Sequence, residues 1–174
     1  FELGYSPNSW DALNKFLKGR GFNDQELIQS GLVVEKSKDQ GSAGRSHYYD
    51  RFRHRIMFPI HDPQGRVIGY SARALDSKEA AKYLNTPQTP LYNKSRALYG
   101  LHLAKQKIRE QDAVIVVEVN MDVVASHETS VANVVASSGT ALTAEQIAML
   151  KRFTGNIVLA FDGDNAGLAA LERG

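Results

Sequence analysis

The chain has 174 residues, 43% of them hydrophobic, with no cysteine and a formal net charge of only +2. This composition fits a globular protein of one mid-sized domain or two small ones, and it excludes disulfides and thiolate metal sites within the chain. No apolar run reaches the roughly 20 residues that span a bilayer and no signal peptide opens the sequence, so we expect a cytoplasmic protein without membrane contact.

The first elements are short helices. Helical spacing over residues 9–18 places Trp10, Leu13, Phe16 and Leu17 on one face, with Asn8 or Ser9 as the cap. Asp24 begins a second short helix, which Gly31 ends. Residues 36–46 form a polar loop.

A hairpin follows. Two apolar runs, 55–60 and 66–70, flank the sequence Asp-Pro-Gln-Gly, which favours a turn. Pro59 lacks an amide donor, so we expect it at a sheet edge or a bulge. Residues 78–98 lack periodicity and are predicted to be a loop.

After a helix expected over residues 101–110, the pattern changes at residue 113 to alternating strands and helices. Apolar runs rich in valine and isoleucine predict strands that are covered on both faces of a parallel sheet. The expected helices are 101–110, 120–128, 143–153 and 165–173, and the expected strands are 113–118, 131–136 and 156–161. The fold class is therefore α/β, with a mixed α+β part followed by a parallel-sheet part.

Charge divides the chain in the same way. Residues 1–110 carry 18 Lys/Arg and 11 Asp/Glu, a net of +7, whereas residues 111–174 carry 3 and 8, a net of −5. We therefore expect a basic N-terminal subdomain over 1–110 and an acidic one over 111–174. The first suits a polyanion and the second a metal ion.

Four carboxylates end the apolar strands of the acidic part. Ligands bind beyond the carboxyl ends of parallel strands, so these side chains are expected to share one edge and to need a divalent cation. All are hard oxygen donors, which favours Mg²⁺ or Mn²⁺. Asp164 as a helix cap and Asp122 as a first-turn acid are the structural alternatives. The candidates are Glu118, Asp122, Asp162 and Asp164.

Cations and aromatic rings interleave between residues 45 and 96. Phosphate-binding cations beside rings that stack on bases are typical of a groove for single-stranded nucleic acid. The alternative is a solvated strand face with the rings turned into the core. The residues are Arg45, Arg51, Arg53, Arg55, Arg66, Arg73, Lys78, Lys82, Lys94 and Arg96, with Tyr48, Tyr49, Phe52, Tyr70, Tyr83 and Tyr92.

These blocks together resemble the catalytic core of bacterial DnaG-type primases, whose metal-binding half is a Toprim domain. The resemblance covers nearly the whole chain. It is carried by Tyr49-Asp50-Arg51-Phe52-Arg53, Arg55-Ile56-Met57-Phe58-Pro59-Ile60, Lys82-Tyr83-Leu84-Asn85-Thr86-Pro87, Leu91-Tyr92-Asn93-Lys94, Met121-Asp122-Val123-Val124-Ala125, Ala136-Ser137-Ser138-Gly139-Thr140 and Phe161-Asp162-Gly163-Asp164.

The resemblance implies a nucleotidyltransferase, a DNA-directed RNA polymerase that synthesises short primers from NTPs on single-stranded DNA during replication. It also implies an RNA–DNA hybrid product and a replicative helicase that binds through a C-terminal module. It assigns catalysis to Glu118, Asp162 and Asp164, metal binding to these and Asp122, and nucleotide or template binding to Arg51, Arg53, Arg73, Lys82, Asn85, Lys94 and Arg96.

The chain departs from the family pattern in three ways. Val119 stands where the family has glycine, and a positive φ there would strain a β-branched residue. The chain stops before the family's next Asp-x-Asp motif, and neither a zinc-binding nor a helicase-binding module is included. We expect a fragment of a longer primase with weak or no priming of its own.

Three other functions are compatible with parts of the sequence. Another Toprim enzyme, a nuclease or topoisomerase, shares the acidic chemistry but not the basic block. A phosphatase with Asp162 as the nucleophile lacks its helper blocks. A fragment that binds single-stranded nucleic acid with an acidic site disabled by Val119 is the non-enzymatic alternative.

Overall fold

A computed structural model describes residues 1–36, 48–138 and 141–161. The chain divides into two compact units, which are described separately. The antiparallel unit comprises residues 2–59 and 69–92, and the parallel unit comprises Phe1, residues 60–68 and the chain from Asn93 onward.

The antiparallel unit is built on a sheet with the strand order β1-β4-β5-β6. The hairpin prediction is confirmed, because β4 and β5 are joined by a turn in which the Gly65 amide donates to the Asp62 carbonyl at 2.9 Å. The loop predicted over 78–98 is corrected, since β6 lies within it. The bounds are β1 Gly4–Ser6, β4 Arg55–His61, β5 Val67–Ala74 and β6 Tyr83–Asn85.

Pro59 lies inside β4, which has a neighbour on both sides in this sheet. The register with β1 runs only from Arg55 to Met57, so Pro59 lies beyond the last of these pairs. The missing amide donor therefore breaks none of these β1–β4 pairs, although the edge position expected for Pro59 is wrong.

The helix predicted over 9–18 is shorter, running as α1 from Ala12 to Lys18. Its expected apolar face is also wrong, because Trp10 is 62% and Phe16 is 54% exposed. Neither Asn8 nor Ser9 caps it. Instead the Asp50 carboxylate accepts the amides of Leu13 and Asn14, at 2.7 and 2.9 Å, so a distant residue satisfies the first turn.

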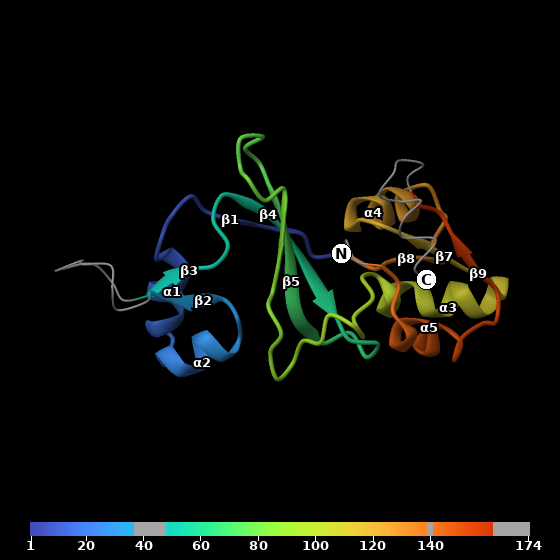
Figure 1. Cartoon of the computed structure of the whole chain (residues 1–174), viewed down its shortest axis with the longest axis horizontal. Coiled ribbons are helices and arrows are strands. Elements are labelled where there is room, and N and C mark those ends of the chain that lie inside the picture. Colours follow the sequence, from blue (N-terminus) through green and yellow to red (C-terminus); the bar gives the residue numbers. More distant parts are fainter. Residues whose placement is uncertain (37–47, 139–140, 162–174) are drawn as a thin grey trace. The chain divides into compact units, whose positions relative to one another are not determined.

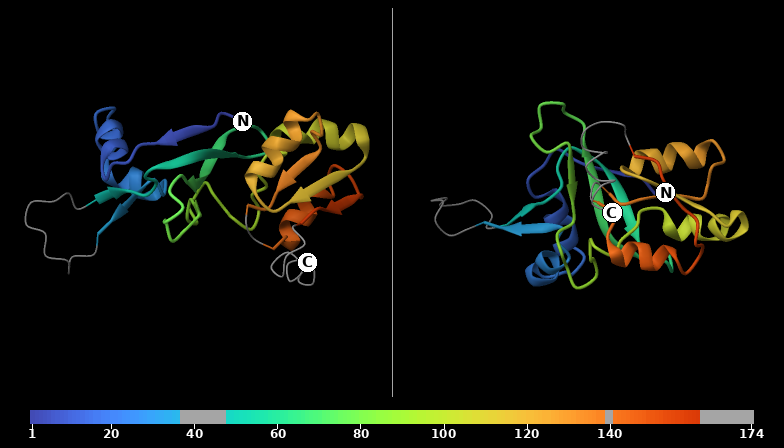
Figure 2. Two further views of the ribbon diagram at one scale, coloured as in Figure 1. Left: turned by 90° about the horizontal axis from the view of Figure 1, so that it is seen from above. Right: turned by 45° about the vertical axis from the view of Figure 1, so that its right-hand side comes forward.

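The second helix, α2 (Asp24–Gln29), agrees with the prediction and carries a capping box between Asn23 and Glu26. Both helices pack beside a two-stranded ribbon (Figure 2). Its antiparallel strands are β2, Val33–Glu35, and β3, Tyr48–Asp50. Asp50 is therefore the last residue of β3, and its side chain caps the first turn of α1.

The parallel unit confirms the predicted alternation of helices and strands. Its sheet has the order β8-β7-β9, and both pairs are parallel. Helices α3 and α5 lie on one side of this sheet and α4 lies on the other (Figure 1). The bounds are α3 Leu101–Gln111, β7 Val114–Val117, α4 Asn120–Glu128, β8 Val134–Ala136, α5 Ala144–Leu150 and β9 Ile157–Leu159.

The core of this unit lies between the sheet and helices α3 and α5. Val114, Val116 and Val135 face Ala104 and Ile108 and are fully buried. Burial of each large aliphatic side chain contributes about 1.5–3 kcal/mol, so this layer fixes the position of β7 and of the residues that follow it.

Strand β9 is less covered than predicted. Val158 is 51% and Leu159 is 36% exposed, whereas a strand buried on both faces was expected. In the part of the chain that the structure describes, β9 lies at the end of the strand order and has a neighbour on one side only. The helix predicted over 165–173 falls outside the described residues. Within the described part of the chain, no helix is long and apolar enough to cross a membrane.

Candidate metal and nucleic-acid sites

Two of the four predicted carboxylates lie at the carboxyl end of β7. Glu118 follows the strand directly, and Asp122 lies in the first turn of α4. An Asp122 oxygen accepts the amide of Val119 at 3.4 Å, which places this carboxylate against the turn between strand and helix. Asp162 and Asp164 lie outside the described residues.

Val119 has φ −119° and ψ 154°, an extended conformation that a β-branched residue adopts readily. The positive φ that would strain a valine at this position is therefore absent. The backbone of the turn after β7 therefore accommodates the valine.

The carboxyl end of β8 lies beside the same turn. The Ser138 hydroxyl donates to the side-chain oxygen of Asn120 at 2.9 Å, and the Ser137 amide donates to the Val117 carbonyl at 3.3 Å. Asn120 and Ser137 are each only 2% exposed. This edge of the sheet is therefore held by buried polar bonds, as a site built on strand ends requires.

The residues present fit a divalent metal ion in donor type. Glu118 and Asp122 supply carboxylate oxygens, the ligands that Mg²⁺ prefers. Over residues 1–36, 48–138 and 141–161, no group of three or more His, Asp or Glu is positioned to hold a metal ion. A complete ligand set would therefore include residues beyond these two.

Arg51 and Arg53, two of the predicted nucleic-acid ligands, contact the antiparallel unit itself. Arg51 donates from Nε to the Gly31 carbonyl at 2.8 Å, and burial lowers the pKa of its guanidinium, against a smaller opposing effect of Tyr49. Arg53 donates to the Asp50 carbonyl. Both therefore support the local backbone in addition to any role with a ligand.

Arg73 and Asn85 are brought to one face of the β5–β6 pair. Arg73 is paired with Tyr83, and Ser71, two residues earlier on β5, is paired with Asn85. Because side chains two residues apart share a face, Arg73 and Asn85 lie on the same side of the sheet. Lys82 immediately precedes β6 and is exposed, and its carbonyl accepts the Ala74 amide at 2.8 Å.

Lys94 and Arg96 belong to the parallel unit. Both lie in the segment that precedes α3, and Arg96 is exposed. The seven predicted ligands are thus divided between the two units, five in the antiparallel unit and these two in the parallel unit.

Trp10 is a candidate that the sequence pattern missed. The guanidinium carbon of Arg53 lies 4.2 Å from the centre of its ring, and Tyr49 meets the ring edge-on with centroids 5.7 Å apart. An exposed indole supported by a cation and a second ring is a surface on which a base can stack. Trp10 precedes a helix and fits its apolar pattern, so only its exposure distinguishes it from a core residue.

Comparison with known proteins decides the family. Residues 1–105 match the family described as DNA primase catalytic core, N-terminal domain, and residues 112–174 match the Toprim domain. The chain belongs to the DNA primase catalytic-core family. Its fold is also that of the primase catalytic core: one part combines helices with antiparallel strands, and the other is built on a three-stranded parallel sheet.

Relatives of this primase chain include the DNA primase of Clostridium acetobutylicum, 44% identical over 174 residues, which are all of this chain and 28% of the relative. The RNA polymerase domain of Mycobacterium tuberculosis primase DnaG has a TM-score of 0.86 at 40% identity, covering 98% of this chain and 56% of that one. A DnaG primase catalytic domain bound to ssDNA has a TM-score of 0.82 at 41% identity, with 98% and 51% covered.

The primase match extends across both halves of the chain, so it distinguishes a primase from a Toprim nuclease or topoisomerase. A Toprim nuclease or topoisomerase would share the acidic part alone, whereas residues 1–105 match the primase N-terminal domain. The chain spans 28% of the length of the Clostridium primase.

Proposed function

We propose that this chain is the central part of a bacterial DNA primase, which synthesises short RNA primers from NTPs on a single-stranded DNA template in the cytoplasm. The observation that carries this proposal is the 44% identity to a DNA primase over the entire chain. The extended backbone of Val119 supports it further, because the turn that carries Glu118 is intact.

In this proposal the carboxylates hold Mg²⁺ at the carboxyl edge of the parallel sheet. Glu118 acts as a ligand or general base, Asp122 as a ligand, and Asp162 and Asp164 complete the set. When bound, the metal stabilises the attacking and leaving oxygens of nucleotidyl transfer. The boundary between the basic and the Toprim parts is proposed at residue 110, which agrees with matches that end at 105 and begin at 112.

The template is proposed to bind the antiparallel unit. A related catalytic domain has been solved with ssDNA, and this unit has the exposed Trp10 ring under Arg53. When a base stacks on Trp10, the phosphates of the same strand can bind nearby cations. Arg51 is a further cation beside this surface, and the remaining candidates Arg73, Lys82, Asn85, Lys94 and Arg96 are proposed to bind nucleotide or template. The RNA–DNA hybrid and the replicative helicase are proposed as partners of the whole protein.

A segment exchange tests the proposal. These 174 residues would replace the matching 174 residues of the Clostridium acetobutylicum primase. Primer synthesis would be measured on a single-stranded template with four NTPs and Mg²⁺. We expect primers from the chimera, and a loss of about 10²-fold or more with Glu118→Gln, since electrostatic stabilisation of the transition state is lost.

The matched control is Glu128→Gln in the same chimera, because Glu128 ends α4 and is exposed. Priming that persists in Glu118→Gln would contradict the proposal, as would a well-folded chimera without any priming. The isolated 174-residue chain is expected to give weak or no primers, and robust synthesis by it would refute that expectation.

A further inference from the structure

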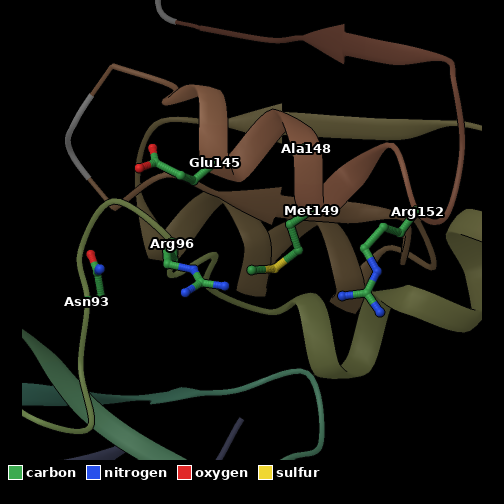
Figure 3. Close-up of a pocket in the computed structure, with 6 residues that line it drawn as sticks. All are labelled: Asn93, Arg96, Glu145, Ala148, Met149 and Arg152. Atoms are coloured by element: carbon green, nitrogen blue, oxygen red, sulfur yellow. The ribbon is translucent and has the colours of Figure 1, made fainter.

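One segment of the parallel unit, residues 93–99, carries two of the proposed nucleotide or template ligands, Lys94 and Arg96. We call it the cationic segment. It forms a turn rather than a helix or strand. Figure 3 shows the segment, marked by Asn93 and Arg96, beside helix α5, marked by Met149. Because a turn has few backbone bonds of its own, its attachments to other elements decide where the two cations lie.

Gln146 of α5 holds the middle of the cationic segment. This residue is fully buried, and its Nε2 donates to the Ala97 carbonyl at 2.7 Å and to the Lys94 carbonyl at 3.4 Å. The hydroxyl of Thr143, the residue that caps α5, donates to the Ser95 carbonyl. The start of α5 thus binds three carbonyls on both sides of the Arg96 side chain.

The side chain of Gln146 is itself fixed by the capping box of α5. Its Oε1 accepts the Thr143 amide at 3.0 Å, and the Thr143 hydroxyl accepts the Gln146 amide at 3.1 Å. A glutamine amide has two N–H groups, and two carbonyls of the cationic segment accept from it. A buried polar group that is satisfied in this way keeps one orientation, so Gln146 is a rigid anchor for the segment.

The far end of the cationic segment is attached to the sheet edge that carries the metal candidates. Tyr99 exchanges two backbone hydrogen bonds with Ala136, the last residue of β8, at 2.9 and 3.1 Å. The next residue, Ser137, donates from its amide to the carbonyl of Val117, which directly precedes Glu118. The segment is therefore held by α5 and by the strand ends within one compact unit.

We propose that Gln146 is a positioning residue, which holds Lys94 and Arg96 where they bind phosphate groups of the template or of an NTP. This inference rests on the proposed function, in which both cations are ligands. Gln146 lies in the part that matches the Toprim domain, whereas the cationic segment lies in the part that matches the primase N-terminal domain. Without the amide, two carbonyls of the segment lose their donor and turn toward water, which displaces both cations.

The test uses the chimeric primase described above, with two measurements: the Kd for oligo(dT) in EDTA, and the KM for NTPs in primer synthesis. Gln146→Met should raise whichever constant is raised by the double variant Lys94→Gln, Arg96→Gln, by about tenfold, because charge-assisted phosphate bonds are lost. Added to that double variant, Gln146→Met should cause no further loss, since it acts through these two side chains. Gln106→Met is the matched control, because Gln106 is exposed on α3 and bonds only Glu110 with its side-chain amide.

If urea denaturation shows that Gln146→Met is unfolded, Thr143→Val takes its place. It removes the bond to Ser95 and should give a smaller loss of the same kind, whereas Thr143→Ser keeps the hydroxyl and should behave as the parent. Parent-like constants in the folded variant, beside a loss in the double cation variant, would overturn this inference alone. An equal further loss in the double cation background would also overturn it, because the effect would then be general. A double cation variant that binds like the parent would refute the proposed role of Lys94 and Arg96, and this inference with it.

Discussion

At the scale of single residues, Asp50 connects three parts of the antiparallel unit. Its carboxylate accepts the amides of Leu13 and Asn14. Its backbone amide donates to the Trp10 carbonyl at 2.7 Å, and its backbone carbonyl accepts a hydrogen bond from Arg53. Asp50 is 2% exposed, so these bonds form away from water. It is thereby a positioning residue for the proposed stacking surface at Trp10.

We predict that Asp50→Asn lowers the free energy of unfolding by about 1–3 kcal/mol, because one helix amide loses its charged acceptor in a buried place. The measurement is urea denaturation. Asp11→Asn is the control, since Asp11 occupies the cap position but makes no capping bond with its side chain. Its exposed ion pair with Lys15 makes a change within about 0.5 kcal/mol the expected result. Equal losses in both variants would contradict the role of Asp50.

Tyr92 combines burial with a hydroxyl that has no partner among the described residues. Burial raises its pKa to about 12. A buried hydroxyl without a hydrogen bond is unfavourable, so Tyr92→Phe should leave stability at pH 7 unchanged or raise it by about 1 kcal/mol. A loss above about 1 kcal/mol would show that the hydroxyl has a partner.

From the raised pKa of Tyr92 we predict that the protein loses stability at alkaline pH. The folded state keeps the phenol protonated to a higher pH than the unfolded chain does, so this stabilisation is complete below pH 10 and is lost as the pH rises to about 12. The free energy of unfolding should fall less in Tyr92→Phe than in the parent over this range. Parallel pH profiles for the two proteins would contradict this origin of the pH dependence.

At the scale of elements, Gly100 sets how α3 begins beside α4. It has φ +82°, and a Cβ there would lie 2.8 Å from a Val123 methyl group. Both the backbone and the space therefore require glycine. Because Val123 is fully buried in α4, the α3–α4 packing depends on this position.

We predict that Gly100→Ala lowers the free energy of unfolding by about 2–4 kcal/mol, from backbone strain together with overpacking. Gly65→Ala is the matched control: Gly65 has φ +89°, but nothing lies within 4 Å of an added Cβ. It should lose only the backbone component, about 1–2 kcal/mol. Both losses would be measured by urea denaturation, and equal losses would contradict overpacking at position 100.

At the scale of the whole molecule, the two parts of the chain carry opposite charge, +7 from 18 basic and 11 acidic residues before 111 and −5 from 3 and 8 after it. Several cations of the basic part are already paired, such as Arg66 with Asp62 and Arg55 with Glu79. Phosphate binding therefore depends on those that remain exposed and unpaired.

We predict that binding of oligo(dT) weakens with salt, and that Lys82→Gln reduces the slope of log K against log salt by about 0.7, the value for one phosphate contact on a single strand. Arg66→Gln should leave the slope unchanged. Trp10 is the only tryptophan, so quenching of its fluorescence reports binding. Equal slopes for Lys82→Gln and the parent would show that Lys82 does not contact a phosphate of the bound strand.

Much of this molecule follows from local sequence. The alternation of apolar runs predicts the parallel sheet, and the Asp62–Gly65 turn predicts the β4–β5 hairpin. Thr143 and Gln146, three residues apart, form a capping box at the start of α5. These features depend on residues close together in the chain, so periodicity and turn chemistry are sufficient to find them.

What only the tertiary structure decided involves residues distant in sequence. The cap of α1 comes from Asp50, β6 forms because β5 provides a partner, and Trp10 is exposed although its spacing suits a core. The backbone angle of Val119 and the attachment of the segment that carries Arg96 to α5 by Gln146 are likewise set by packing. Sequence records which residues are present along the chain, whereas long-range contacts determine which of them meet and which reach solvent.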